Sequence, residues 1–255
     1  MNLETKQPQH AHDRLWELDT VRGIAVVLMI FYHFVFDLAY FNVYAVDMYR
    51  GPWQVFARGI GTTFIVVMGI SLTLRYNRLK PELEQGRVFR KYLLRGATLV
   101  GWGIVVTAAT YFVVGRGFVV FGILHLLGSS TILAFPFLRS RWAALVGGLV
   151  AIGAGLYVNH LVSAHPWWLW LGVQQIGRFM VDWYPVLPWF GFALLGVFLG
   201  FSLWPGGRRR IELPDLSQVA PVRGLTFLGR HSLFIYLIHQ PVLLGLLIVT
   251  GIGSL

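Results

Sequence analysis

Four ionisable side chains lie along a single apolar stretch near the N-terminus: Asp19, Arg22, His33 and Asp37. If this stretch is an α-helix, Arg22 and His33 lie about 20° apart around its axis and roughly 16 Å apart along it. Asp37 is one turn beyond His33 and can reach its imidazole, and Asp19 is close enough to pair with Arg22. The spacing predicts one polar stripe along the helix, with an ion pair near the start of the helix and a His–Asp pair deeper in the protein.

This stripe contains the residue types that acyl transfer needs. A carboxylate that holds one ring nitrogen of an imidazole leaves the other nitrogen free as a general base. We therefore expect His33 and Asp37 to be catalytic, with the pair of Asp19 and Arg22 at the end of the stripe. The alternative is a helix that simply turns its polar side toward its neighbours. That alternative is strongest for Asp19 and Arg22, which lie near the membrane interface.

Four further polar residues are candidates to line the same pocket: His125, Asp182, Tyr236 and His239. Tyr236 and His239 share one helix face with Ser232. A buried structural histidine is the simpler interpretation of His239, whereas His125 is open to both interpretations. No HxxxH or HxH pattern and no carboxylate-rich cluster accompanies the histidines, so we predict no metal site.

The composition is typical of a membrane protein. Hydrophobic residues make up 56% of the 255 residues and charged residues only 13%, about half the charged share of soluble domains. The net charge of +10 is spread between apolar blocks, so we expect no nucleic-acid partner. Cysteine is absent, which excludes disulfides, thiolate metal sites and cysteine nucleophiles.

Seven apolar blocks are long enough, at roughly 20 residues, to cross a bilayer. They predict an all-α, polytopic membrane helical bundle with spans near 21–41, 55–74, 95–114, 118–138, 142–162, 186–204 and 231–252. The Trp-rich segment from Pro166 to Pro185 also carries charged and amide side chains, which favours an interfacial or re-entrant helix. Residues 1–14 are polar and predict a short cytoplasmic tail. No repeat is found, so 15–255 is expected to be one transmembrane domain.

The basic residues predict the orientation of these spans. With the N-terminus inside, 17 of the 21 Lys and Arg residues lie in cytoplasmic segments, and the outer segments keep only Arg50, Arg58, Arg116 and Arg178. Because positive residues are retained on the cytoplasmic side, we expect a cytoplasmic N-terminus, an external C-terminus and an odd number of crossings. The expected location is the cytoplasmic (inner) membrane, with the lipid bilayer as an obligatory partner.

Four segments, in order along the chain, resemble transmembrane acyltransferases. The first is Leu-Asp-Thr-Val-Arg-Gly-Ile-Ala at 18–25, with Met29 and His33 after it. The others are Phe-Gly-Ile-Leu-His-Leu-Leu-Gly at 121–128, Asp-Trp-Tyr-Pro-Val-Leu-Pro-Trp at 182–189, and the run from Gly229 to Pro241. They resemble a bacterial domain similar to the catalytic domain of heparan-alpha-glucosaminide N-acetyltransferase. The spacing of Arg22 and His33 also resembles the bacterial integral-membrane O-acyltransferases, which carry a basic residue, ten intervening residues and a His.

The resemblance implies a mechanism in which cytoplasmic acyl-CoA, with acetyl-CoA favoured, passes its acyl group to an acceptor on the outer face. It implies Arg22, with its partner Asp19, as the cofactor-binding residues and His33 as the essential histidine. One departure matters: the lysosomal enzyme's catalytic His lies in the first non-cytoplasmic loop, and residues 42–54 here contain no His. In that enzyme the helix also has Asn where this chain has His33. The catalytic assignment therefore follows the O-acyltransferase pattern, and the heparan substrate is not carried over.

Three functions remain open at this point. The first is an acyltransferase that modifies an exported glycan, lipid or amino sugar. The second is a proton-coupled transporter or flippase, in which the polar stripe forms a path without covalent chemistry. The absence of resemblance between the two halves of the chain argues against it, because transporters usually carry inverted repeats. The third is a non-catalytic membrane partner of another enzyme. The oligomeric state, a homodimer included, is left open.

Overall fold

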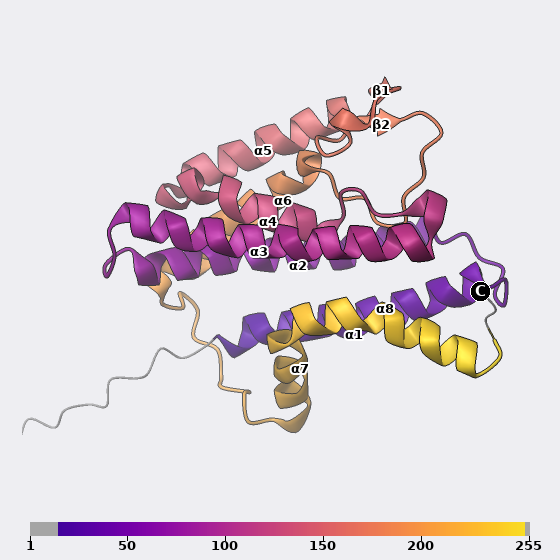
Figure 1. Cartoon of the computed structure of the whole chain (residues 1–255). Helices are drawn as coiled ribbons and strands as arrows, with labels where there is room; N and C mark the ends of the chain where they lie inside the picture. The colour runs from indigo at the N-terminus through magenta and orange to yellow at the C-terminus, as the bar shows by residue number, and fades with distance from the viewer. Residues whose placement is uncertain (1–14, 253–255) are drawn as a thin grey trace, which may run out of the picture.

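The computed structural model describes residues 15–252, and nearly all of its regular structure is helical (Figure 1). The α-helices are α1 (Trp16–Tyr40), α2 (Gly51–Leu79), α3 (Gln85–Val113), α4 (Ile123–Leu133), α5 (Arg141–Val158), α6 (Val186–Leu203), α7 (Ala220–Arg230) and α8 (Ser232–Val249). Short 3-10 turns are η1 (Gly115–Gly117), η2 (Phe135–Arg139), η3 (Pro166–Trp168) and η4 (Pro205–Gly207). The predicted all-α polytopic bundle is confirmed.

Six of the helices in the described part of the chain are long and apolar enough to cross a membrane: α1, α2, α3, α5, α6 and α8. The remaining predicted span, the fourth along the chain at 118–138, is only partly helical. Its helix, α4, has 11 residues and covers about 16 Å, roughly half the thickness of the hydrocarbon layer. Pro136 stands in the 3-10 turn η2 that follows, and its missing N–H prevents the α-helix from continuing.

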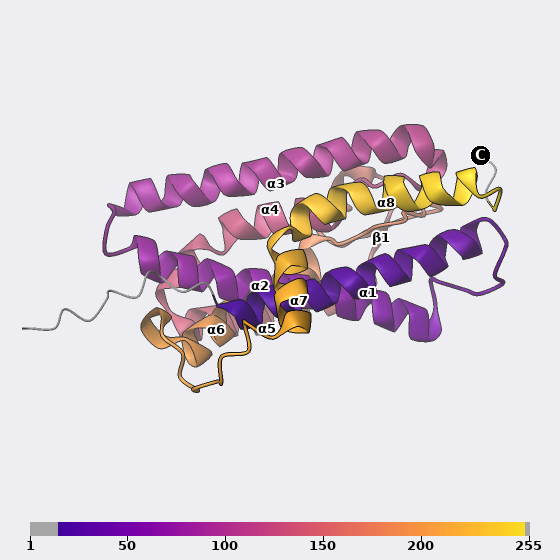
Figure 2. The same ribbon diagram turned by 90° about the horizontal axis from the view of Figure 1, so that it is seen from below.

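Successive helices run in alternate directions along the bundle (Figures 1 and 2). The fourth pass consists of α4 together with η2. The loops 80–84 and 204–219 therefore lie toward the same end of the molecule, here named the α7 end, where Arg209 Nε lies 2.8 Å from Glu17 Oε1 of α1. The loops 41–50, 114–122 and 159–185 meet at the opposite end, here named the loop end. There the rings of Tyr49 and Phe179 lie 4.7 Å apart.

Glycines allow the helices of the bundle to approach one another closely. A Cβ on Gly69 of α2 would lie 2.1 Å from the carbonyl oxygen of Ala193 in α6. A Cβ on Gly96 of α3 would lie 2.7 Å from the carbonyl oxygen of Gly128 in α4, and the reciprocal substitution meets Gly96 at the same distance. Membrane helices associate through such small-residue contacts because lipid offers no hydrophobic drive. The glycine-rich composition thus accounts for the packing of α2 to α6.

The expected interfacial or re-entrant helix at Pro166–Pro185 is wrong. The segment is an irregular loop that contains η3 and a minimal parallel pairing of β1 (Val162–Ser163) with β2 (Gln174–Gln175). Gly172 and Gly177 have φ values of +125° and +67°, which interrupt any helix between the two prolines. The loop closes over the end of the bundle, since the N–H of Tyr184 bonds to the carbonyl of Phe121 at 3.1 Å.

The helix α7 was not expected from the sequence. It is a short helix that crosses α1 next to the start of α8 (Figure 2). The predicted last span, 231–252, is confirmed as α8, and the motif that opens it turns the chain sharply at His231 between the two helices. As a result α1, α7 and α8 form one group beside the bundle of α2 to α6 (Figure 1).

The orientation in the membrane stays a prediction, and single cysteines test it because the chain has none of its own. The positive-inside rule places the α7 end in the cytoplasm. A membrane-impermeant maleimide applied to intact cells should label Ala45→Cys and Thr250→Cys, both exposed at the loop end. It should spare Glu82→Cys and Gln218→Cys until the cells are lysed. Labelling of the second pair in intact cells would reverse the orientation.

Candidate active site

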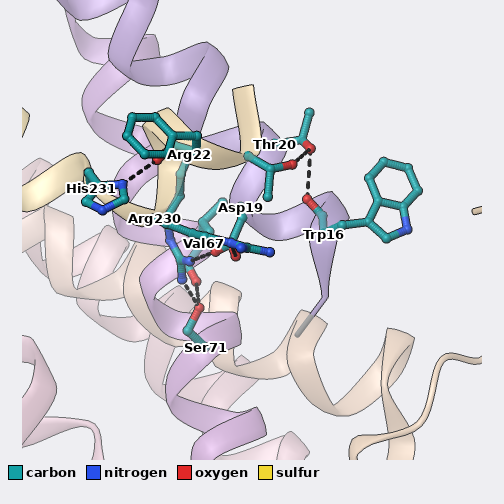
Figure 3. Close-up of polar contacts among 10 residues, drawn as sticks. Trp16, Asp19, Thr20, Arg22, Val67, Ser71, Arg230 and His231 are labelled. Carbon is teal, nitrogen blue, oxygen red and sulfur yellow. Dashed lines mark hydrogen bonds and ion pairs between the residues drawn. The ribbon is translucent and has the colours of Figure 1, made fainter. Parts of the chain in front are cut away.

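A buried carboxylate organises the α7 end of the site. Asp19 is 3% exposed and accepts a hydrogen bond from Nη1 of Arg22 at 2.8 Å, which is the contact expected from the sequence. Its second oxygen lies 3.4 Å from Nε of Arg230, the last residue of α7. Arg22 also donates to the hydroxyl of Ser71 in α2. Figure 3 shows Arg22 and Arg230 converging on Asp19. The cluster therefore joins α1, α2 and α7.

Two glycines bring α7 close enough to make this contact. A Cβ on Gly229 would lie 1.8 Å from the carbonyl oxygen of Asp19, and one on Gly23 would lie 2.0 Å from that of Leu225. No other residue type fits where the two backbones touch. The hydroxyls of Thr20 and Thr226 lie 3.1 Å apart at the same crossing. Arg230 and Ser71 were missed by the sequence reasoning. Only the Gly229–Arg230 pair, at the start of the last motif, could have indicated one of them.

The α7 end carries a surplus of positive charge. Arg22 and Arg230 both contact the carboxylate of Asp19, and Arg22 and Arg75 both act electrostatically on Arg95 of α3. Beside α7 is a hollow of about 340 Å³ lined by Ser217, Gln218, Arg223, Thr226, Phe227, Arg230 and His231. Guanidinium groups bind phosphate well, often through two hydrogen bonds at once. The hollow and the cluster together offer a site for a phosphorylated ligand.

Two histidines meet about three helical turns away from this cluster, between α1 and α8. The ring of His33 lies 4.7 Å from the ring of His239, centre to centre, in an edge-on arrangement. Nδ1 of His33 lies 2.9 Å from the carbonyl oxygen of Met29, and Nδ1 of His239 lies 2.7 Å from that of Tyr236. A carbonyl only accepts, so in each neutral ring Nδ1 carries the hydrogen and Nε2 is the free lone pair.

The expected hydrogen bond between His33 and Asp37 is not formed, which corrects the predicted pair. His33 turns its Nδ1 back to the backbone of its own helix, and Asp37 accepts instead from Nε2 of Gln240 at 2.6 Å. Asp37 is 1% exposed, and the bond links α1 to α8. Gln240 was not named as a site residue by the sequence reasoning. Its place directly after His239 in the last motif was the available signal.

Asp182 connects the loop end to the same region. Its Oδ2 accepts from the backbone N–H of Ile123 at 3.0 Å, which places a carboxylate at the N-terminus of α4. The hydroxyl of Tyr236 also donates to Asp182, and the Tyr236 ring lies 5.7 Å from that of His239. Burial raises the pKa of Asp182 to about 6, although both hydrogen bonds act in the opposite direction. The loop is thereby fastened to both α4 and α8.

The structure places His125 in the first turn of α4, where it is buried. Its Nδ1 accepts from the N–H of Gly122 at 3.4 Å, and its ring packs beside Phe121 and against Gly103 of α3. These contacts hold the ring of His125 between α3 and α4, and none of them involves His33. Within residues 15–252, no three His, Asp or Glu side chains are grouped so that they could hold a metal ion.

Residues 14–241 match the family described as heparan-alpha-glucosaminide N-acetyltransferase, catalytic. The chain belongs to this family. The match covers almost all of α1 to α8 and agrees with the resemblance read from the motifs. Comparisons with curated proteins and with solved structures each give no match. We therefore assign the chain as a membrane protein of the acetyltransferase type. Its candidate active site consists of the Arg22 cluster and the histidine pair.

The crossing of α1 and α7 gives a prediction about stability. Gly229→Ala should destabilise the folded protein by about 1–3 kcal/mol, because the new methyl group overlaps the backbone of Asp19. Gly224→Ala, on the same helix, has nothing within 4 Å of the new Cβ and should be neutral or slightly stabilising. Thermal unfolding in detergent measures both. Equal melting temperatures for the two variants would show that α7 does not dock on α1 in this way.

Proposed function

We propose that the protein transfers an acetyl group from acetyl-CoA, bound from the cytoplasmic α7 end, to an acceptor that reaches the site from the loop end. One observation carries the proposal. The guanidinium of Arg22 and the imidazole of His33, with its free Nε2, lie on the same face of α1, and Arg230 of α7 joins Arg22 at Asp19. Arg22 and His33 are separated by roughly 16 Å along the helix. Acetyl-CoA carries phosphates at one end and a thioester at the other, so its site needs cations at the first end and a base at the second.

The residues present suit the ends of coenzyme A. Its phosphates would lie at the α7 end, where Arg223 and Arg230 line the hollow and Arg22 contacts the other oxygen of Asp19. The pantetheine arm is comparable in length to the rise from Arg22 to His33 and would follow the face of α1. The thioester would then reach the histidine pair. This placement agrees with the general use of acetyl-CoA in the family.

The histidines provide the proton transfer. Nε2 of His33 takes the proton from the N–H or O–H of the acceptor as that atom attacks, and it returns the proton to the departing sulfur. The thioester supplies an activated acetyl group, whose C–S bond breaks as the new C–N or C–O bond forms. The hydrogen bond from Nδ1 of His33 to Met29 fixes the tautomer, which is the task that was expected of Asp37. His239 packs edge-on against His33 and orients its ring.

The purified protein tests this function. In detergent it should release free coenzyme A from acetyl-CoA when a mixture of amines and alcohols is supplied. His33→Gln should lower the rate by about 10²–10⁴-fold, as expected for removal of a general base. His160→Gln makes the same change at an exposed histidine of the loop end and should leave the rate unchanged.

Two outcomes would contradict the proposal in different ways. If His33→Gln keeps more than about a tenth of the rate, the general base is another group. If the folded wild-type protein binds acetyl-CoA without turning it over, the polar stripe serves transport or docking instead. Circular dichroism and gel filtration of each variant separate loss of chemistry from loss of fold.

A further inference from the structure

An apolar cavity lies between α1, α2 and the end of α6, toward the α7 end of the molecule. Its volume of about 500 Å³ is typical of ligand sites, which measure about 300–1,000 Å³. Leu18 and Val21 of α1 form one wall, residues of α2 between Thr62 and Ile70 form another, and residues between Leu203 and Leu213 form the third. Val21 and Arg22 are neighbours in α1 and point about 100° apart, so the cavity lies on a different side of the helix from the polar stripe.

The walls of this cavity are apolar, apart from one ion pair at its α7 end. Thr62 and Thr63 carry hydroxyls, but each hydroxyl donates to the carbonyl four residues earlier in α2, at 2.7 and 2.9 Å. Ile211 and Leu213, in the loop after α6, also line the cavity, and they are 61% and 46% exposed. Ordered water needs polar partners, which these walls do not offer. Their chemistry fits a hydrocarbon chain.

The cavity extends over the depth of one leaflet of a membrane. The three helices that line it, α1, α2 and α6, are each long and apolar enough to cross a bilayer. The lining residues Thr62 and Ile70 are eight positions apart, which is about 12 Å along α2. Half of the hydrocarbon layer is about 15 Å thick. Trp204 lines the cavity at the end of α6, and tryptophan is typical of the membrane interface. The cavity therefore follows the path of an acyl chain inward from the interface.

Three consecutive arginines lie at the α7 end of the cavity. Arg209 lines it and donates to both carboxylate oxygens of Glu17, at 2.8 Å each. Arg208 and Arg210 flank this pair and are exposed. Within residues 15–252 neither of them forms an ion pair, with the acidic residues of the same loop included. Guanidinium groups bind phosphate well. Basic residues directly after a membrane-crossing helix are also typical of contact with phospholipid headgroups.

We infer that this cavity binds a membrane phospholipid, with one acyl chain between α1 and α2 and the phosphate at Arg208 and Arg210. A chain gains little by leaving one hydrocarbon environment for another, so the phosphate contacts must provide most of the preference for this site. The bound lipid would support α1 against α2 beside the ion pair of Glu17 and Arg209. The inference does not depend on acyl transfer.

Three probes separate the two parts of the ligand. Dioleoyl phosphatidic acid has both the chains and the phosphate, dioleoylglycerol lacks the phosphate, and glycerol 3-phosphate lacks the chains. Native mass spectrometry of the purified full chain, stripped of lipid in detergent, counts the molecules bound to each chain. The wild type should bind one phosphatidic acid at least about tenfold more tightly than either of the other probes, a difference of about 1.4 kcal/mol.

Matched variants locate the binding site. Val21→Trp places an indole in the cavity and should weaken the binding of phosphatidic acid at least about tenfold. Val27→Trp makes the same change at a similarly exposed position of α1 outside the cavity, and it should bind like the wild type. Lipid that merely surrounds the helices would respond alike to both tryptophans.

A double variant tests the phosphate contacts and keeps the inference testable if Val21→Trp does not fold. Arg208→Gln with Arg210→Gln should also weaken the binding of phosphatidic acid about tenfold. Arg50→Gln with Arg116→Gln makes the same change at two exposed arginines of the loop end and should have no effect.

Four results would overturn the inference. Equal binding by Val21→Trp and Val27→Trp, or by the two double variants, would place the lipid elsewhere. Dioleoylglycerol that binds as tightly as phosphatidic acid would show that the phosphate is not recognised. Glycerol 3-phosphate that binds as tightly would leave an anion site only. A lipid-free dimer of the wild type that Val21→Trp dissociates would assign the cavity to a second copy of the chain.

Discussion

The buried carboxylate of Asp19 is the interaction on which the arrangement of the site depends. An uncompensated charge in this position would be expensive, so the carboxylate requires Arg22 from its own helix and Arg230 from α7. Gly23 and Gly229 allow the two backbones to meet at that point. The same contacts fix where α7 ends and α8 begins. They therefore determine how α8, with His239 and Gln240, lies along α1.

From this anchor, α1 places two different chemistries on one face. Its first turns hold Arg22 at the α7 end, and its later turns hold His33 beside His239 and Asp37 beside Gln240. Asp182 then fastens the outer loop to α8 through Tyr236. The site consequently has guanidinium groups at the α7 end and the pair of histidines further along α1. This polarity suits the proposed reaction, in which a phosphorylated acyl donor lies between the guanidinium groups and the histidines.

The sequence predicted those features that depend on neighbouring residues. Apolar length predicted six of the seven spans, and the i,i+3 spacing predicted the pair of Asp19 and Arg22. Features that depend on distant residues were not predictable in this way. Gln240 is 203 positions from Asp37, and nothing in the helical period shows that it outcompetes His33 for the carboxylate. Likewise, α7 is too short and too polar to resemble a span, and its docking depends on glycine contacts that only the fold creates.

The central claim is that acetyl-CoA lies lengthwise along α1, with its nucleotide at the α7 end and its thioester at the histidines. Photolabelling with an acetyl-CoA analogue that carries an azide on its adenine tests this claim most directly, with the labelled peptides mapped by mass spectrometry. The account predicts label on α7 and on the adjoining loop 215–219, and competition by unmodified acetyl-CoA. Competed label on the loops 41–50 or 159–185 would contradict it, since the nucleotide would then lie at the opposite end of the bundle.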